Sequence, residues 1–258
     1  MENKIEAVIF DWAGTTVDYG CFAPVQAFTE VFKEFGVEPT MDEVRKPMGM
    51  LKIDHIRTML SMERIQNLWQ EKYGRPSSEE DVQAMYDVYE AKLLSVLDQY
   101  AEVKPGVLEA VAKLRENGVK IGSTTGYTDK MMEIVTKTAK ENGYEPDAWF
   151  SPDAVNSKGR PYPYMIFENM KKLEIDSVKK VVKVGDTISD ILEGKNAGVF
   201  SVGVIEGSSE MGMSQEEYEA LSAEEKEAAV KRVKESFLAA GADDVIRTME
   251  ELPELVLS

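Results

Sequence analysis

The sequence contains very little cysteine and histidine: Cys21 and His55 are the only residues of their kinds among 258. One cysteine cannot form a disulfide within the chain, which fits a reducing compartment, so we expect a cytoplasmic protein. Long apolar runs are missing too, since no stretch reaches the roughly 18 residues of a membrane-spanning helix. The amino-terminal MENKIEAVIF leads directly into an expected strand, so we expect no signal peptide.

Basic residues are outnumbered: 30 Lys and Arg stand against 47 Asp and Glu, which gives a formal net charge of −17. Such a charge repels nucleic-acid backbones and anionic membranes, so we expect neither as a partner. An anionic substrate would need local positive charge or a metal ion. The glycine-rich patterns GxGxxG and GxxxxGK[ST] do not occur, which argues against a nucleotide-binding fold.

Short segments rich in Val and Ile alternate with longer helical patterns along most of the chain. The expected strands are residues 5–12, 119–126, 180–187 and 200–207. The expected helices are residues 107–118, 129–143, 164–175 and, in an acidic tail, 222–241. This alternation predicts an α/β fold with a Rossmann-like parallel sheet and right-handed crossovers.

Residues 21–99 break the alternation. The segment is nearly all helical in pattern and contains no convincing strand, with its clearest helices at 24–36 and 77–100. We therefore predict a helical cap domain of residues 21–99, inserted after the first strand of a core formed by residues 1–20 and 100–258. The hinges are expected near residues 18–24 and 100–106.

Polar side chains follow the expected strands at the point where each strand ends: Asp11, then Thr124 and Thr125, then Asp186 with Asp190 close behind. In a doubly wound sheet these ends meet at one crevice, where ligands bind. A single such Asp is most often a helix cap or a turn residue. Several together favour a site for Mg²⁺, which prefers carboxylates, backbone carbonyls and water.

These strand ends occur in the segments FDWAGTT, GSTTG and GDTISD, and Arg160 lies in a further segment, GRPYP. Their spacing resembles that of the haloacid dehalogenase-like hydrolases. The resemblance implies a phosphoryl-accepting nucleophile at Asp11, a hydroxyl at Thr125 that orients phosphoryl oxygens and a charge-balancing cation at Arg160. It also implies Mg²⁺ held by Asp186 and Asp190. These parts suit phosphoryl transfer, which depends mainly on positioning and on neutralising charge.

Ala13 departs from the general family pattern. Most phosphatases of this family carry Asp two residues after the nucleophile, where it protonates the leaving oxygen and activates water. Without that acid, expelling an alkoxide should be slow. Either the enzyme is degraded, or its leaving group needs no proton on oxygen.

The segment RKPMGMLKIDHIRTML carries Lys52 and His55, which share one face of a helix. Taken alone, Lys52 is most often a solvated lysine and His55 a surface or interface residue. However, KPMGMLKIDH together with FDWAGTTVDYG, GSTTGYT, GRPYP and KVGDTISD resembles the phosphonatase family over essentially the full chain. The resemblance implies that Lys52 forms a Schiff base with the aldehyde of phosphonoacetaldehyde and that His55 assists proton transfers around the imine.

The same resemblance implies further site residues and an assembly. Around the substrate it places Cys21, Met48, Gly49 and Tyr127, although simple packing remains an alternative for Cys21 and Met48. Gly49 also suits a close backbone approach. The predicted Mg²⁺ site comprises Asp11, Ala13, Asp186 and Asp190. A homodimer joined through the helical inserts is also implied.

Three functions were compared on this basis. The first is hydrolysis of the C–P bond of phosphonoacetaldehyde to acetaldehyde and phosphate, through a Lys52 Schiff base and an aspartyl phosphate on Asp11. The second is a phosphatase or mutase acting on phosphate esters, against which Ala13 argues. The third is a catalytically dead phosphate-binding or scaffold protein, against which the intact Asp11, Thr125 and Arg160 argue.

Overall fold

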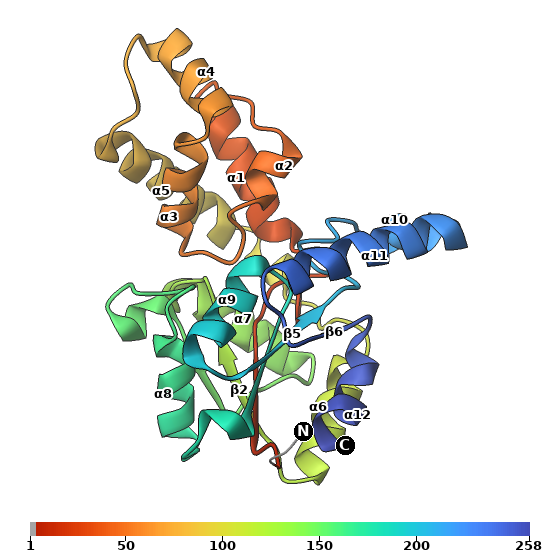
Figure 1. Cartoon of the computed structure of the whole chain (residues 1–258). Coiled ribbons are helices and arrows are strands. Elements are labelled where there is room, and N and C mark those ends of the chain that lie inside the picture. The colour runs from red at the N-terminus through yellow and green to blue at the C-terminus, as the bar shows by residue number, and fades with distance from the viewer. Residues whose placement is uncertain (1–3) are drawn as a thin grey trace.

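A six-stranded parallel sheet forms the centre of the computed structural model, which describes residues 4–258 (Figure 1). Its order is β3-β2-β1-β4-β5-β6, and every neighbouring pair is parallel. The strands are β1 (Ala7–Phe10), β2 (Lys120–Thr124), β3 (Ala148–Phe150), β4 (Val181–Gly185), β5 (Phe200–Val204) and β6 (Asp244–Ile246). The predicted α/β fold with a Rossmann-like parallel sheet is confirmed.

Helices cover both faces of the sheet because its strands are apolar on both sides. Val8 and Phe10 of β1 pack into one apolar cluster, whereas Ala7 and Ile9 pack into another on the opposite face. The helices of this part are α6 (Val107–Glu116), α7 (Asp129–Glu141), α8 (Tyr164–Lys172), α9 (Ile188–Ala197), α10 (Gln215–Ala220), α11 (Ala223–Ala239) and α12 (Leu252–Leu257).

Five helices between β1 and α6 stand together at the carboxyl-terminal end of the sheet, at the top of Figure 1. They are α1 (Phe22–Glu34), α2 (Met41–Arg45), α3 (Lys52–Leu60), α4 (Glu63–Tyr73) and α5 (Glu79–Leu94). Phe28 of α1 stacks on Tyr89 of α5 with ring centroids 4.1 Å apart, and both rings are buried. No strand occurs in residues 21–99, all of which the structure describes.

The elements differ from the sequence-based expectation mainly at their ends. The four expected strands are each shorter than predicted, and the expected helix at 77–100 is divided into α5 and a 3₁₀ turn at Leu97–Tyr100. The sequence analysis missed β3 and β6. Each has three residues and lies at an edge of the sheet, so neither is long enough to show a strand periodicity.

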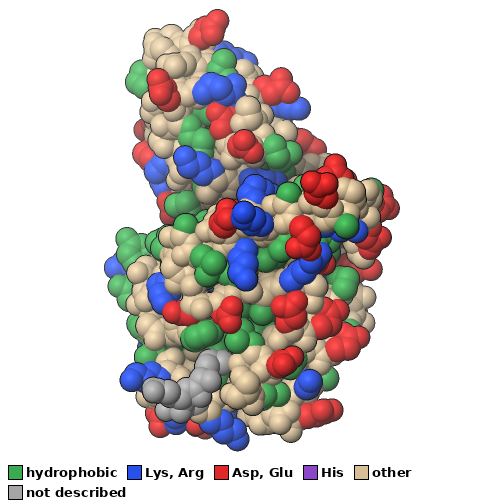
Figure 2. Space-filling view, turned by 45° about the vertical axis from the view of Figure 1, so that its right-hand side comes forward, with side chains coloured by type: hydrophobic (Ala, Val, Ile, Leu, Met, Phe, Trp, Pro, Cys, Tyr) green, Lys and Arg blue, Asp and Glu red, His purple; other side chains and the backbone are tan. Residues whose placement is uncertain are grey.

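Charged side chains lie mainly on the surface. In Figure 2 acidic and basic groups are interspersed over the visible face, with acidic groups most numerous on its right-hand side, and no histidine is visible. Among residues 4–258, no helix combines the length and the apolar character needed to cross a membrane.

Phe237 of α11 fixes the acidic tail to the sheet. Its ring is fully buried, and it fills the space above Gly203 of β5, where a Cβ would come within 2.5 Å of the ring. We expect Phe237→Ala to lower the free energy of unfolding by about 3–5 kcal/mol, because it leaves a cavity at this contact. Denaturant unfolding should measure the loss. Leu238→Ala is the control: Leu238 is 47% exposed, so its truncation should change stability by less than about 0.5 kcal/mol.

Candidate active site

The two central strands bring the predicted carboxylates together. Asp11 directly follows β1, and Asp186 directly follows the neighbouring strand β4, where the order of connection reverses. The backbone N–H of Asp11 donates to the carbonyl of Val184 at 2.9 Å, which keeps the residue in line with the sheet. The carboxyl ends of the strands at such a switch point form the ligand crevice of doubly wound sheets.

Carboxylate oxygens of Asp11, Asp186 and Asp190 lie within 4.8 Å of one another, and all three residues are buried. Burial, followed by the charges of Asp11 and Asp190, raises the pKa of Asp186 well above its usual range. Among the described residues Asp186 has no ion pair; it accepts hydrogen bonds from Thr15 Oγ1 at 2.9 Å and from the Ser209 N–H at 2.8 Å.

Gly14 leaves room for the Asp186 carboxylate. A Cβ on Gly14 would lie 2.0 Å from Asp186 Oδ2, and its φ of +89° is one that other residues rarely adopt. A buried carboxylate without an ion pair, as Asp186 is among the described residues, is a ligand expected for a hard divalent cation, and Asp11 and Asp190 bring further carboxylate oxygens close to it. The residues present therefore fit a metal ion.

Asp190 is held by its own helix. Thr187 caps α9: its hydroxyl accepts from the Asp190 N–H and donates to Asp190 Oδ2. The other oxygen, Oδ1, lies 3.1 Å from Arg160 Nη1 and 2.8 Å from Lys183 Nζ. Burial alone would raise the pKa of Asp190, but Arg160 and Lys183 hold it below its usual value.

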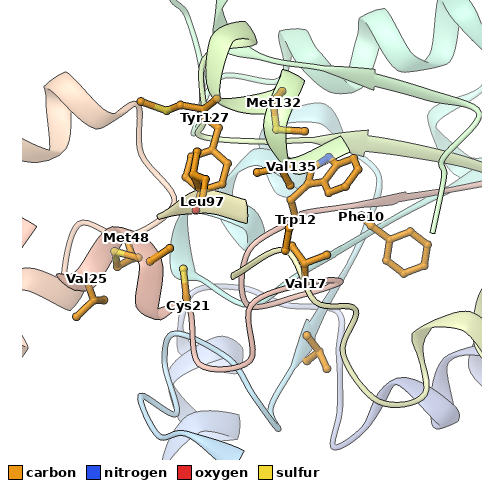
Figure 3. Packing of buried hydrophobic residues seen from close by; sticks show 14 of the residues in the cluster. Phe10, Trp12, Val17, Cys21, Val25, Met48, Leu97, Tyr127, Met132 and Val135 are labelled. Atoms are coloured by element: carbon orange, nitrogen blue, oxygen red, sulfur yellow. The ribbon is translucent and has the colours of Figure 1, made fainter. Parts of the chain in front are cut away.

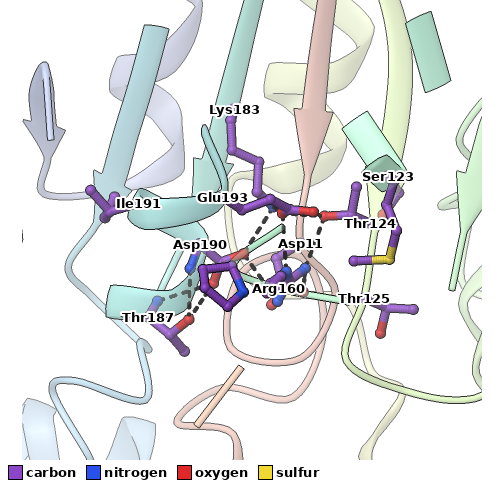
Figure 4. A network of polar contacts seen from close by, with 12 residues as sticks. Asp11, Ser123, Thr124, Thr125, Arg160, Lys183, Thr187, Asp190, Ile191 and Glu193 are labelled. Atoms are coloured by element: carbon purple, nitrogen blue, oxygen red, sulfur yellow. Dashed lines mark hydrogen bonds and ion pairs between the residues drawn. The ribbon is translucent and has the colours of Figure 1, made fainter. Parts of the chain in front are cut away.

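Arg160 contacts three buried carboxylates at once, as Figure 4 shows. Its Nη2 pairs with Asp11 Oδ1 at 2.5 Å, its Nη1 with Asp190 at 3.1 Å, and its Nε with Glu193 Oε2 at 3.1 Å. Burial opposes a charged guanidinium, but these carboxylates raise the pKa of Arg160 above its usual value. Arg160 is therefore a permanent positive charge directly beside Asp11.

A small cavity of about 20 Å³ lies between the helical insert and the sheet. It is lined by Asp11, Ala13, Cys21, Met48, Gly49, Lys52, Thr125, Gly126, Tyr127, Arg160 and Thr187. Nine of these were predicted as site residues. The other predicted residues, His55, Asp186 and Asp190, are buried close by without lining the cavity. A volume of roughly 10–15 Å³ already holds one water, so the cavity is closed to anything larger than a water or two.

Lys52 is the first residue of α3 and only 4% exposed. Its Nζ lies 5.0 Å from the ring centroid of Tyr127. Burial lowers the pKa of Lys52, although Cys21 and Asp11 oppose this shift. The positive end of the α3 dipole acts in the same direction as burial. The alternative that Lys52 is solvated and His55 lies at the surface is wrong, since both are buried.

His55 lies one turn further along the same helix and is fully buried. Its ring stacks on Phe28 with centroids 3.7 Å apart, and its Nε2 is 2.8 Å from the carbonyl oxygen of Val44. Burial, then the nearby Lys52, holds the pKa of His55 well below its usual value. A neutral imidazole that donates from Nε2 leaves an acceptor at Nδ1, and that atom has no hydrogen-bond partner among residues 4–258.

Cys21, Met48 and Tyr127 combine packing with a place in the cavity wall. All three belong to the large apolar cluster in which Figure 3 labels them, and all three line the cavity. Gly49 provides the close approach considered from the sequence: a Cβ there would lie 2.4 Å from Thr187 Oγ1. Its φ of +84° also favours glycine.

Comparisons with known proteins agree with this geometry. Residues 5–198 match the family profile of the haloacid dehalogenase-like hydrolases. The chain is 55% identical, over 98% of its length and 94% of the relative's, to a phosphonoacetaldehyde hydrolase of Lysinibacillus sphaericus. It is 52% identical, over 99% of its length but 40% of the relative's, to a bifunctional phosphonoacetaldehyde hydrolase/aminoethylphosphonate transaminase of Clostridioides difficile.

A crystal structure of a phosphonoacetaldehyde hydrolase-like protein from Oleispira antarctica superposes with a TM-score of 0.95. The two chains are 38% identical, and the match covers 98% of this chain and 92% of that one. The chain belongs to the haloacid dehalogenase-like hydrolases. Within them it is a member of the phosphonoacetaldehyde hydrolase family, as the resemblance of its motifs predicts.

Two buried residues of this hydrolase were missed from the sequence. Lys183 lies in the middle of β4, and Glu193 lies one turn after Asp190 on α9; both join the network around Arg160. A lysine inside the apolar strand VVKVG was the available signal, because an unpaired charge is rarely buried. The helical spacing of Asp190 and Glu193 was a second signal.

Asp186→Asn tests whether this hydrolase keeps a carboxylate there for a metal ion. Because the folded-state pKa of Asp186 is raised, the metal-free protein loses stability as the pH rises through that pKa, and asparagine avoids the loss. Near neutral pH with a chelator, we expect the variant to melt roughly 2–4 °C higher than the parent. That shift corresponds to a gain of about 1 kcal/mol in the free energy of unfolding.

Mg²⁺ should then raise the melting temperature of the parent hydrolase clearly and that of Asp186→Asn only slightly. Thermal unfolding with chelator and with saturating Mg²⁺ measures both effects. Asp98→Asn, at an exposed position, is the control and should behave like the parent. Equal Mg²⁺ stabilisation of Asp186→Asn and the parent would contradict the assignment.

Proposed function

We propose that this hydrolase cleaves the C–P bond of phosphonoacetaldehyde to give acetaldehyde and phosphate, with Lys52 and Asp11 as its two covalent catalysts. The observation that carries the proposal is that a buried lysine of the insert and a strand-end aspartate of the core line one cavity. The names of the curated relatives point to the same substrate.

Lys52 begins the reaction as an amine nucleophile. A neutral amine condenses with the aldehyde, takes up one proton and releases water, which gives a protonated imine. This imine is an electron sink for the carbon bonded to phosphorus. The lowered pKa of Lys52 supports this role, because only the unprotonated amine attacks. His55, buried on the same face of α3, is proposed to assist proton transfers around the imine.

Asp11 then attacks phosphorus. The C–P bond breaks, its electron pair passes into the imine to form an enamine, and the phosphoryl group becomes an aspartyl phosphate. Arg160, held beside Asp11, would balance the phosphoryl charge, and Thr125 would orient its oxygens. Water hydrolyses the aspartyl phosphate, while the enamine takes a proton on carbon and the resulting imine is hydrolysed to acetaldehyde.

Ala13 fits a leaving group that is carbon. The enamine departs without a proton on oxygen, so an acid two residues after the nucleophile would have no leaving oxygen to protonate. Ala13 also lines the cavity beside Asp11, where a carboxylate would add a further buried negative charge. The absent acid therefore marks the reaction class and does not indicate a degraded enzyme.

Mg²⁺ is the metal proposed for the acidic cluster, held by Asp11 and Asp186 with the Ala13 backbone carbonyl. Asp190, already paired with two cations, is proposed to support the site from behind. When bound, Mg²⁺ supplies positive charge that neutralises the phosphoryl oxygens and the nucleophile.

Residues 21–99 are proposed to act as a cap that opens to admit substrate, with core segments 1–20 and 100–258 below it. The small cavity supports this, because a phosphonate is larger than the water it could hold. Arg45 of the insert reaches the core at Ser209, donating to its carbonyl at 3.2 Å, a contact that opening would break.

We also propose a cytoplasmic homodimer joined through the inserts. Met41 and Tyr73, both in the insert, are among the large apolar side chains that stay exposed, at 50% and 39%. The unpaired Cys21 beside Lys52 suits a reducing compartment.

The Schiff base is tested by trapping. Borohydride added with phosphonoacetaldehyde should inactivate the enzyme and leave a two-carbon fragment on Lys52, located by peptide mass spectrometry. Lys52→Arg should abolish turnover, because a guanidinium stays protonated. Lys46→Arg, at an exposed lysine of the same insert, is the matched control and should retain full activity. A fragment on another lysine, or substantial turnover by Lys52→Arg, would refute the role of Lys52.

The meaning of Ala13 is tested by Ala13→Asp. We expect C–P hydrolysis no faster than the parent's and a loss of about tenfold or more in kcat/KM, because another buried carboxylate repels an anionic substrate. Ala13→Asn adds similar bulk without charge and should lose less. Steady-state assays of acetaldehyde release compare the three enzymes, and a faster Ala13→Asp enzyme would show that the explanation for Ala13 is wrong.

A further inference from the structure

Lys183 carries a buried positive charge that the proposed chemistry does not use. It lies in the middle of β4, its side chain is 1% exposed, and it does not line the cavity. Figure 4 shows it on the far side of Asp190 and Glu193 from the cavity residue Thr125. Burying a charged lysine costs free energy unless ion pairs and hydrogen bonds compensate, so the contacts of Lys183 indicate its role.

Lys183 and Arg160 form ion pairs with the same two carboxylate oxygens. Lys183 Nζ lies 2.8 Å from Asp190 Oδ1 and 3.5 Å from Glu193 Oε2. Arg160 contacts the same two oxygens, with Nη1 and Nε, each at 3.1 Å. Thr124 Oγ1 accepts from both cations, at 3.1 Å from Lys183 and 3.0 Å from Arg160, and donates to Glu193.

Because Lys183 and Arg160 share the oxygens of Asp190 and Glu193, Lys183 affects which carboxylate Arg160 contacts most closely. Three carboxylates face the guanidinium, and only Asp11 lies on the cavity side. Without Lys183, Arg160 would be the only cation paired with Asp190 and Glu193. Both carboxylates would then draw the guanidinium inward, away from Asp11.

We propose that Lys183 is a positioning residue: by neutralising Asp190 and Glu193 from behind, it holds Arg160 Nη2 at Asp11, where a phosphoryl group arrives. The inference rests on the proposed function for the identity of that group. Inorganic phosphate, the expected product, shares the chemistry and can be bound without turnover.

The experiment uses the full chain with Mg²⁺ and measures phosphate affinity by calorimetry and kcat with phosphonoacetaldehyde. For Lys183→Met we expect phosphate affinity to fall about tenfold or more and kcat to fall about 100-fold, the scale of a small misplacement of a catalytic group. Glu193→Gln removes a competitor for Arg160, so its phosphate affinity should rise above the parent's. The double variant K183M/E193Q restores the charge balance and should recover about tenfold of the affinity that Lys183→Met loses.

A purely structural role predicts a different pattern. Lys183→Met and Glu193→Gln would then both lower stability, while phosphate affinity per folded molecule stayed equal to the parent's in both, and the double variant would rescue nothing. That result, or weaker phosphate binding by Glu193→Gln, would overturn the proposal. If Lys183→Met does not fold, the phosphate affinity of Glu193→Gln still tests the proposal: only an affinity above the parent's supports it.

The outcomes also separate this inference from the proposed function. A parent enzyme that binds phosphate but does not cleave phosphonoacetaldehyde would refute the function, while the phosphate affinities would still test Lys183. A parent that cleaves the substrate, with a Lys183→Met variant equal to it in kcat and phosphate affinity, would refute only the role of Lys183.

Discussion

The site depends on the ion pair between Arg160 and Asp11. Taking two opposite charges out of water costs more than their attraction returns unless further partners satisfy them. Here those partners come from two other elements: Asp190 and Glu193 on α9, and Lys183 on β4. Together these elements hold one arrangement in place: the Arg160 cation beside the Asp11 carboxylate. The sheet, the buried network and the Thr187 cap of α9 all contribute to it.

This arrangement resolves the conflict between an acidic protein and an anionic ligand. The chain carries a net charge of −17, yet three buried cations lie where a phosphoryl group would bind: Arg160 and Lys52 line the cavity, and Lys183 pairs with Asp190 on the side of Asp190 away from the cavity. In a buried site each charge is screened far less than at the surface. Local placement therefore outweighs the net charge.

The helical insert completes the site from the other side. Gly49 meets Thr187 where no side chain would fit, and Arg45 reaches Ser209, whose N–H holds Asp186. The insert thus contacts Thr187, the neighbour of Asp186 in the chain, and Ser209, which hydrogen-bonds to Asp186. The insert packs over the sheet and buries Lys52, and this burial lowers the pKa of Lys52. In the proposed reaction, the position of the insert would therefore control how readily Lys52 acts as a nucleophile.

The sequence by itself determined the parallel sheet, the helical insert and the strand-end residues Asp11 and Thr125, because strand ends are local properties. The resemblance of its motifs to a known family supplied most of the other residues that line the cavity. It did not determine the short edge strands β3 and β6, which pair only once the sheet exists. Nor could it show that Lys52 and His55 are buried, or that Lys183 and Glu193 surround Arg160. Burial and charge sharing depend on side chains of different elements packing together, and some of them are far apart in the chain: Asp11 and Arg160 are separated by 149 residues. Only tertiary packing brings such groups into contact.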